Sequence, residues 1–430
     1  MSERSELLKL AAPLAAQQVG FQLMGTVDAL MLGRYSDAAL AGAGVGNNLL
    51  FGITSIAMGI VMGMDTVVPQ ALGARRDVDA RRLVGAGARL GILVGLAATL
   101  LTMLSPLLLT IADVTPEVVA EARPYVYIRA LGVVPFVLTI VLRSYLAAKG
   151  HTRPLLVAVI AGNIVNAALD LLLIYGLHLG VLGAGLATLI VQLLTLAVYA
   201  VAIRALDQGE ARPASTRADI LHIAHYGWPV AGQLFAEIGV FSLATVLAAH
   251  LGEIPAAAHS IALNLASFTF SFALGIASAT GVRVGHAVGS GDLALARSRG
   301  LLGVRVGLAV MACFAAMFLL VPHVVARAFT DSAPVLVATV PLLQIAALFQ
   351  LSDGTQAVGA GALRGLGDTR ATFAGNLVGH YIVGLPISLG LCFGAGMGAP
   401  GLWWGLSAGL TATAIYLVVR FVRSTTESRR

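Results

Sequence analysis

Long apolar stretches recur along the whole chain, and each is broken by only a short polar segment. A stretch of about 20 apolar residues is long enough to cross the hydrocarbon layer of a bilayer as a helix. Inside that layer no water is present to satisfy the backbone, so a helix is the expected form of each stretch. Only 11% of the 430 residues are charged, against about 25% in soluble domains. The sequence therefore predicts an all-α integral membrane protein.

The apolar pattern predicts twelve transmembrane helices. The run after Lys9 extends beyond signal-peptide length and has no small-residue cleavage site, so we interpret it as the first of these helices. The predicted spans are residues 10–32, 38–72, 84–109, 125–148, 155–177, 182–203, 222–249, 255–282, 301–322, 335–363, 372–392 and 400–419.

The basic residues are distributed as the positive-inside rule requires. If the N-terminus is cytoplasmic, only Arg34, Arg123, Arg129 and Arg327 of the 27 lysines and arginines fall on the opposite side. We therefore expect both termini to be cytoplasmic. The net charge of +6 then needs no nucleic-acid partner, because the same loops can also serve as a basic face for anionic lipid.

The second half of the chain resembles the first at a shift of about 216 residues. Each copy holds six predicted helices, an even number, so both copies enter the membrane in the same sense. We expect two six-helix lobes related by a pseudo-twofold axis along the membrane normal. The predicted division is an N-terminal lobe at 1–203, a cytoplasmic linker at 204–219 and a C-terminal lobe at 220–430. The matched positions are Pro13 with Pro229, Gln17 with Gln233, Gly59 with Gly275, Ala71 with Ala287 and Gly73 with Gly289.

Four acidic residues fall inside predicted spans: Asp28, Asp170, Glu237 and Asp353. A carboxylate at the bilayer centre costs about 2.5–3.5 kcal/mol on insertion scales, so we interpret the four as functional. The alternative is that they are structural and are satisfied by hydrogen bonds between helices. His380 lies within a span as well, and it is either a proton carrier or a packed histidine.

Oxygen-bearing side chains accompany these acids. Asn166 lies four residues before Asp170 and shares its helix face, and Thr188 lies on the next predicted helix. Together with Asp28 they form a set suited to a sodium ion or to a proton shared by two carboxylates. Thr188 can instead bond only its own helix. In the C-terminal lobe, Gln233 shares a face with Glu237, and Phe349 shares one with Asp353.

Several motifs occur in an order that identifies a family. On their basis the chain resembles, over essentially its full length, the MATE (multidrug and toxic compound extrusion) transporters, and the NorM branch in particular. The motifs are Val27-Asp28-Ala29-Leu30-Met31-Leu32-Gly33-Arg34, Ile174-Tyr175-Gly176, Val282-Arg283-Val284-Gly285, Gln350-Leu351-Ser352-Asp353 and Gly361-Ala362-Leu363-Arg364-Gly365.

The resemblance implies two sites. In the first lobe, Asp28, Asn166, Asp170 and Thr188 match the family's cation or proton site. In the second lobe, Glu237 and Asp353 match its acidic site for substrate or cation, and we add their face neighbours Gln233 and Phe349. Related proteins often carry a tyrosine at the position of Phe349, whose side chain offers no oxygen to a sodium ion.

The expected function is export of cationic drugs and toxins by antiport with H+ or Na+, through alternating access of the two lobes. We expect a secondary transporter and not an enzyme, located in the bacterial inner membrane, monomeric, without a cofactor, and in contact with membrane lipid. Two alternatives remain open. One is a flippase for lipid-linked saccharides of the same superfamily, which would favour arginine or lysine within the membrane. The other is an intramembrane enzyme, although neither a nucleophile elbow nor a pair of metal-binding histidines at helical spacing is found.

Overall fold

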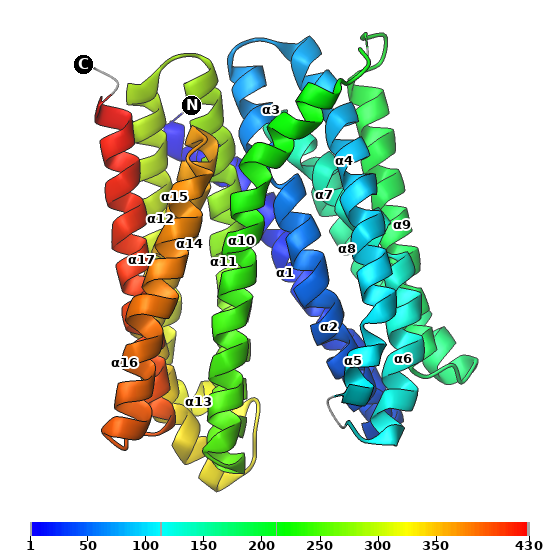
Figure 1. Cartoon of the computed structure of the whole chain (residues 1–430), viewed down its shortest axis with the longest axis vertical. Helices are drawn as coiled ribbons and strands as arrows, with labels where there is room; N and C mark the ends of the chain where they lie inside the picture. Colours follow the sequence, from blue (N-terminus) through cyan, green and yellow to red (C-terminus); the bar gives the residue numbers. More distant parts are fainter. Residues whose placement is uncertain (1, 112–113, 212, 428–430) are drawn as a thin grey trace. The chain divides into compact units, whose positions relative to one another are not determined.

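The computed structural model describes residues 2–111, 114–211 and 213–427, and no strand occurs among them. Helices occupy nearly all of this length (Figure 1). Arg212, which belongs to the predicted linker, lies outside the described residues. The all-helical prediction is confirmed for the part of the chain that the structure describes.

The helices form two compact units. The first unit comprises Ala16–Ala231, and the second comprises the described residues before Ala16 together with those from Gly232 onward. Helices α1 (Glu3–Tyr35) and α10 (Arg217–His250) are each continuous, and each is divided between the two units. Pro13 and Pro229 lie just before these division points, where each removes a backbone hydrogen bond. The lobe boundaries given above remain a prediction.

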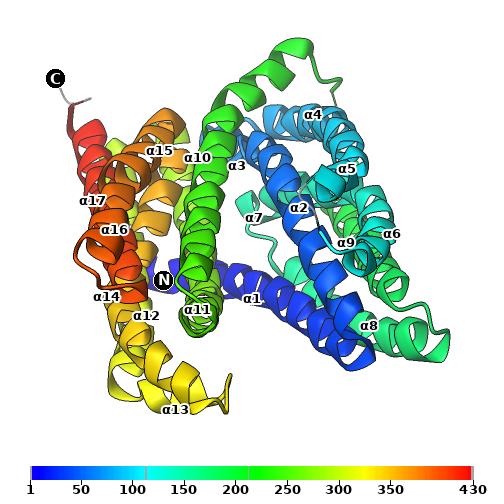
Figure 2. The same ribbon diagram turned by 60° about the horizontal axis from the view of Figure 1, so that its bottom comes forward.

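In the first unit, α2 packs beside α6, and α8 packs beside α9 (Figures 1 and 2). Helices α6 and α7 meet at 44°, and Pro135 near the start of α7 lacks the N–H that would continue the upstream helix. Besides its parts of α1 and α10, this unit contains α2 (Asp37–Val61), α3 (Met64–Gly73), α4 (Asp77–Leu104), α5 (Pro106–Ile111), α6 (Pro116–Leu131), α7 (Val133–Ala148), α8 (Arg153–Asp170), the π-helical η1 (Leu171–Gly176) and α9 (Val181–Leu206).

In the second unit, α14 packs against α11, α12 and α17. Carboxylate caps begin two of its helices, because Asp292 accepts from the Leu295 N–H and Asp368 accepts from the Ala371 N–H. Besides its parts of α1 and α10, this unit contains α11 (Glu253–Gly289), α12 (Leu293–Leu320), α13 (Pro322–Arg327), α14 (Ala333–Leu366), α15 (Thr369–Leu377), η2 (Val378–Gly384), α16 (Leu385–Leu389), η3 (Gly390–Gly394) and α17 (Ala399–Glu427).

Among the described residues, ten helices are long and apolar enough to cross a membrane, and the bent pair α6 and α7 makes eleven if it is counted as one span. They correspond to the second to twelfth predicted spans. The first predicted span, 10–32, lies inside α1, which does not belong to this set. Three glutamines and Asp28 make that segment more polar than the others. The count of twelve therefore remains a prediction.

The internal repeat recurs in two equivalent close contacts. In the first unit, a Cβ added at Gly59 of α2 would lie 2.3 Å from the Cα of Ala231 in α10. In the second unit, a Cβ added at Gly275 of α11 would lie 2.4 Å from the Cα of Ala15 in α1. Only glycine permits such a close approach of two backbones. The shift that relates the two glycines also relates the two alanines, so the start of each copy's first helix packs on the second helix of the other copy.

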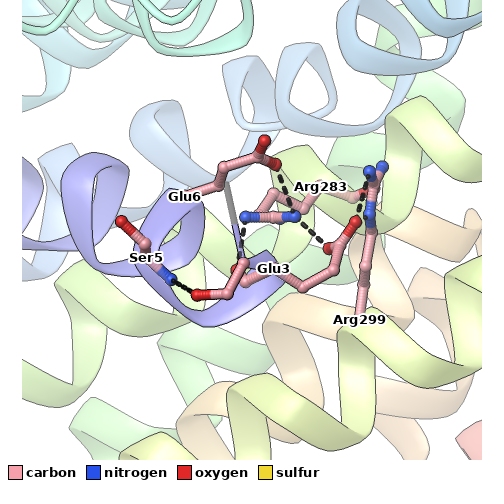
Figure 3. A network of polar contacts seen from close by, with 6 residues as sticks. Glu3, Ser5, Glu6, Arg283 and Arg299 are labelled. Carbon is pink, nitrogen blue, oxygen red and sulfur yellow. Dashed lines mark hydrogen bonds and ion pairs between the residues drawn. The ribbon is translucent and has the colours of Figure 1, made fainter.

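Two arginines of the second unit hold the start of α1 (Figure 3). Arg299 of α12 binds Glu3 with two hydrogen bonds, both of 3.1 Å. Arg283 of α11 contacts the carboxylate of Glu3, its backbone oxygen at 2.9 Å and the carboxylate of Glu6 at 3.1 Å. The Arg283 side chain is only 8% exposed, so it needs these negative partners. This network fastens the first turn of α1 to the second unit.

The network makes a pH-dependent contribution to stability. The hydrogen bond from Arg299 lowers the pKa of Glu3 more than partial burial raises it. The stabilisation is therefore complete above the ordinary glutamate pKa of about 4.3 and is lost as the pH falls through the lower pKa of the folded protein. We expect Glu3→Gln to reduce stability by about 1 kcal/mol at pH 7. Thermal unfolding in detergent should show this difference from wild type at pH 7, and it should disappear in strong acid.

Glu253→Gln is the matched control, because Glu253 also lies in the first turn of a second-unit helix and is exposed without an ion pair to any described residue. It should unfold like the wild type at every pH. A difference for Glu3→Gln that is independent of pH would contradict the account.

Candidate functional site

The first unit brings together the four residues predicted for its site. Asp28 comes from α1, Asn166 and Asp170 from α8, and Thr188 from α9. The Thr188 hydroxyl donates to Asp28 Oδ2 at 3.0 Å, while Asn166 and Asp170 are fully buried. No hydrogen bond joins Asn166 to Asp170, although the two lie one turn apart on the same helix face. Three helices thus contribute to one buried polar cluster, which we call the first acidic site.

The first acidic site has more acceptors than donors. Both oxygens of Asp170 and Oδ1 of Asp28 are buried without a hydrogen-bond donor among the described residues, and the side-chain amide of Asn166 is unpaired as well. The carboxyl groups of Asp170 and Asp28 lie close enough to interact electrostatically. Two neighbouring carboxylates inside a protein are stable together only when a proton or a cation lies between them. The oxygens present suit either a shared proton or a small hard cation.

Local backbone features hold this cluster in place. Asp170 is the last α-helical residue before η1, a π-helical turn of the kind that often accompanies functional sites. Helix α9 lies directly against η1, because a Cβ added at Gly183 would be 2.8 Å from the backbone carbonyl carbon of Leu173. The Tyr175 hydroxyl donates to the Met31 backbone oxygen at 2.6 Å and ties η1 to α1. The three elements that carry the site are therefore joined to one another.

Two residues of α6 border the first acidic site and were missed by the sequence analysis. Tyr125 interacts electrostatically with Asp28 and Asp170, and the Arg129 guanidinium lies over its ring at 5.9 Å from the centroid. The Nε and Nη1 atoms of Arg129 are buried without a hydrogen-bonding partner among the described residues. The sequence offered a sign of this residue's role, because Arg129 is a charged side chain inside a predicted membrane span.

The second unit also brings its predicted residues together, in what we call the second acidic site. Gln233 and Glu237 lie on α10, and Asp353 lies on α14. Gln233 Nε2 donates to Glu237 Oε1 at 3.1 Å. Asp353 is buried and interacts electrostatically with Glu237. A second pair of carboxyl groups is thus placed close together within the membrane-spanning helices.

Phe349 belongs to an aromatic cluster beside the second acidic site. Its ring packs edge-on against Trp403 at 5.3 Å and Phe241 at 6.1 Å between centroids. The ring of His380 lies 6.1 Å from the same Phe241, and both of its nitrogens are buried without a partner among the described residues. Phe349 therefore contributes an aromatic surface to the second acidic site and no oxygen ligand.

Gln356 and Asn376 are the residues of the second acidic site that the sequence analysis missed. Gln356 Nε2 donates to Glu237 Oε1 at 2.6 Å and to Asn376 Oδ1 at 3.1 Å. The available signal was the position of Gln356, three residues after Asp353 and hence on the same helix face. Nothing in the sequence placed Asn376 of α15 beside it.

Removing charge from the first acidic site should stabilise the fold. We expect Asp170→Asn to raise the free energy of unfolding by about 1 kcal/mol. The amide removes the repulsion between the carboxylates of Asp170 and Asp28, and binding sites are commonly less stable than their neutral variants. Thermal unfolding in detergent measures the change.

Asp207→Asn is the control for this measurement. Asp207 is also a buried carboxylate of the first unit, but it accepts the single O–H of Tyr145, whose oxygen lies 2.9 Å from Oδ1 and 3.0 Å from Oδ2. Its replacement should destabilise the protein by about 1.5–3 kcal/mol. Destabilisation by Asp170→Asn of the same size would show that Asp170 is structural.

Comparison with known proteins places the chain in a family. The MatE family model matches the chain twice, at residues 13–172 and 229–389, and the two starts differ by the shift found in the sequence. A probable multidrug resistance protein NorM from Pseudomonas putida is 34% identical over 98% of this chain and 94% of its own length. A multidrug resistance protein NorM from Burkholderia vietnamiensis is 35% identical over 96% of this chain and 92% of its own length.

The fold is similar to that of solved transporters. An outward-facing structure of a multidrug resistance MATE family transporter superposes with a TM-score of 0.92 at 19% identity, covering 100% of this chain and 97% of that one. A transporter of the MOP superfamily from Pyrococcus furiosus, whose binding pocket is described as of reverse polarity, superposes with a TM-score of 0.91 at 19% identity, with the same coverage. The prediction of a helical, two-lobe, multi-pass membrane protein is thereby confirmed.

Proposed function

Because the chain belongs to the MATE family of multidrug efflux transporters, which are secondary transporters and not enzymes, we propose that it exports organic cations in exchange for protons or sodium ions. The observation that carries this proposal is that each unit places a pair of interacting carboxyl groups inside its helices, with Asp170 and Asp353 buried. Buried negative charge is costly in a membrane and is best explained by a positive ligand that neutralises it.

We assign the coupling ion to the first acidic site. Its unpaired oxygens and few donors, described above, suit a proton or a sodium ion. The second acidic site differs, because amide groups from Gln233 and Gln356 already donate to Glu237 and an aromatic cluster lies beside it. Aromatic faces attract organic cations. This difference supports a role for the second site in binding the exported cation.

Coupling follows from alternate neutralisation of the two sites. The first acidic site is neutralised by the coupling ion in one half of the cycle and the second by the cargo in the other, with the two lobes alternating in access. A one-for-one exchange of a proton for a monovalent cation moves no net charge, so only the pH gradient drives it, at about 1.4 kcal/mol per pH unit. With two ions per cargo the membrane potential adds about 2.3 kcal/mol per 100 mV.

The orientation of the chain follows from its basic loops. We place it in the bacterial inner membrane with both termini in the cytoplasm, because the distribution of basic residues supports that orientation and the relatives named above are bacterial. We expect the monomer to be the working unit, because each acidic site is built from a single chain.

The flippase alternative is not favoured by the relatives named above, which are multidrug resistance proteins. A lipid-linked saccharide carries negative charge and needs unpaired basic side chains within the membrane. Arg143 pairs with Asp65 at 3.6 Å, and Arg283 is occupied by Glu3 and Glu6. Both arginines are therefore already neutralised by carboxylates, whereas Nε and Nη1 of Arg129 have no hydrogen-bonding partner among the described residues.

Transport in proteoliposomes tests the proposal. A sodium gradient and a pH gradient should be imposed separately while the movement of a fluorescent cationic dye is followed, and one of them should drive export. Asp28→Asn should reduce gradient-driven export at least tenfold, because it removes a charge that the coupling ion neutralises.

Asp37→Asn is the matched control, because Asp37 is an exposed aspartate at the start of α2, outside both acidic sites. It should transport at the wild-type rate. Wild-type export by well-folded Asp28→Asn would overturn the assignment of the coupling ion.

A further inference from the structure

A chain of buried amides runs from the second acidic site to a backbone carbonyl. Glu237 of α10 accepts from Gln356 of α14 at 2.6 Å, Gln356 donates to Asn376 of α15 at 3.1 Å, and Asn376 Nδ2 donates to the Thr372 backbone oxygen at 2.9 Å. Gln356 and Asn376 are 2% and 0% exposed. Three helices are thus joined by side-chain amides at the acid itself.

The direction of every bond in this chain is fixed. The Thr372 carbonyl can only accept, so Asn376 must present its NH2 group to Thr372 and its oxygen to Gln356. Gln356 must then present its NH2 group, and both hydrogens of that group are used, one on Asn376 and one on Glu237. The backbone carbonyl of Thr372 therefore determines that Gln356 donates a hydrogen bond to Glu237.

The donors converge on one oxygen of Glu237. Oε1 accepts from both Gln356 and Gln233, whereas Oε2 accepts no hydrogen bond from the described residues. Partly positive N–H groups around Oε1 repel a cation from that oxygen. The carboxylate is therefore held in one orientation, with a single oxygen left for a positive ligand.

We propose that Gln356 is a positioning residue that fixes Glu237 so that Oε2 alone receives the exported cation. This inference rests on the proposed function and deepens it by naming a residue that positions the acid at the cargo site. The second acidic site also contains the Asp353 carboxylate, which interacts electrostatically with Glu237, and the unpaired Gln233 Oε1. A bulky organic cation needs only one charged contact beside an aromatic wall. Gln356 thus fixes which oxygen of Glu237 is presented to the cation.

The test is the concentration dependence of dye export in proteoliposomes. Gln356→Met retains the length of the side chain but removes both donors. We expect it to raise the KM for a cationic dye about tenfold and to leave the maximal rate within about twofold, since Glu237 keeps its charge but loses its orientation. Asn376→Ala frees only the far end of Gln356 and should raise KM about threefold.

Gln350→Met is the matched control. Gln350 lies on the same helix and is fully buried, but its amide has no hydrogen-bonding partner among the described residues. This variant should retain the wild-type KM. The melting temperature of each variant shows whether it is folded. If Gln356→Met does not fold, the KM of Asn376→Ala provides the test instead.

A double-mutant cycle separates this inference from the proposed function. In a Glu237→Gln background, Gln356→Met should have no further effect on KM, because its partner charge is already absent. If Glu237→Gln raises KM but Gln356→Met does not, or if the two effects simply add, Gln356 does not position the acid and the inference fails while the proposed function stands. If Glu237→Gln itself leaves KM unchanged, the second acidic site does not bind the cargo and both fail.

Discussion

Closely paired carboxyl groups inside membrane-spanning helices are the constraint on which the other features of this protein depend. Asp28 and Asp170 in the first unit, and Glu237 and Asp353 in the second, are close enough within each pair to interact. Such groups make the protein less stable than an apolar core would, unless a positive ligand joins them. The surrounding architecture holds them in place, with the π-helical turn after Asp170 and the amide chain behind Glu237 as the two clearest examples.

The duplicated chain provides two similar frames for two different sites. The equivalent glycine contacts at Gly59 and Gly275 show that both copies use the same close helix crossing. Within these frames the polar residues have diverged. The first acidic site has unpaired oxygens and a bordering arginine, whereas the second has amide donors and aromatic rings. One scaffold can thus hold a small ion in one unit and an organic cation in the other.

Much of the fold and of both sites could be predicted from the sequence, because hydropathy and charge act locally. The intramembrane acids stand out against an apolar background, and one-turn spacing was enough to pair Gln233 with Glu237. Glu237 and Asp353 of the second unit lie far apart in the chain, and there the family resemblance supplied the link. Asn376 was missed, because a neutral amide in a helix has no distinctive pattern and its role depends on the packing of α14 against α15. The π-helical turns and the division of α1 between two units also depend on tertiary contacts that periodicity does not encode.

The central claim is that these acids are neutralised alternately by the coupling ion and by the cationic cargo. The most direct measurement is the number of ions released when a cationic dye binds the purified protein, followed with a pH indicator in weakly buffered solution and with a sodium-selective electrode. The account predicts release of at least one proton or sodium ion per dye bound, and a smaller release when Asp28 and Asp170 are both replaced by asparagine. Tight dye binding that releases neither ion would contradict it.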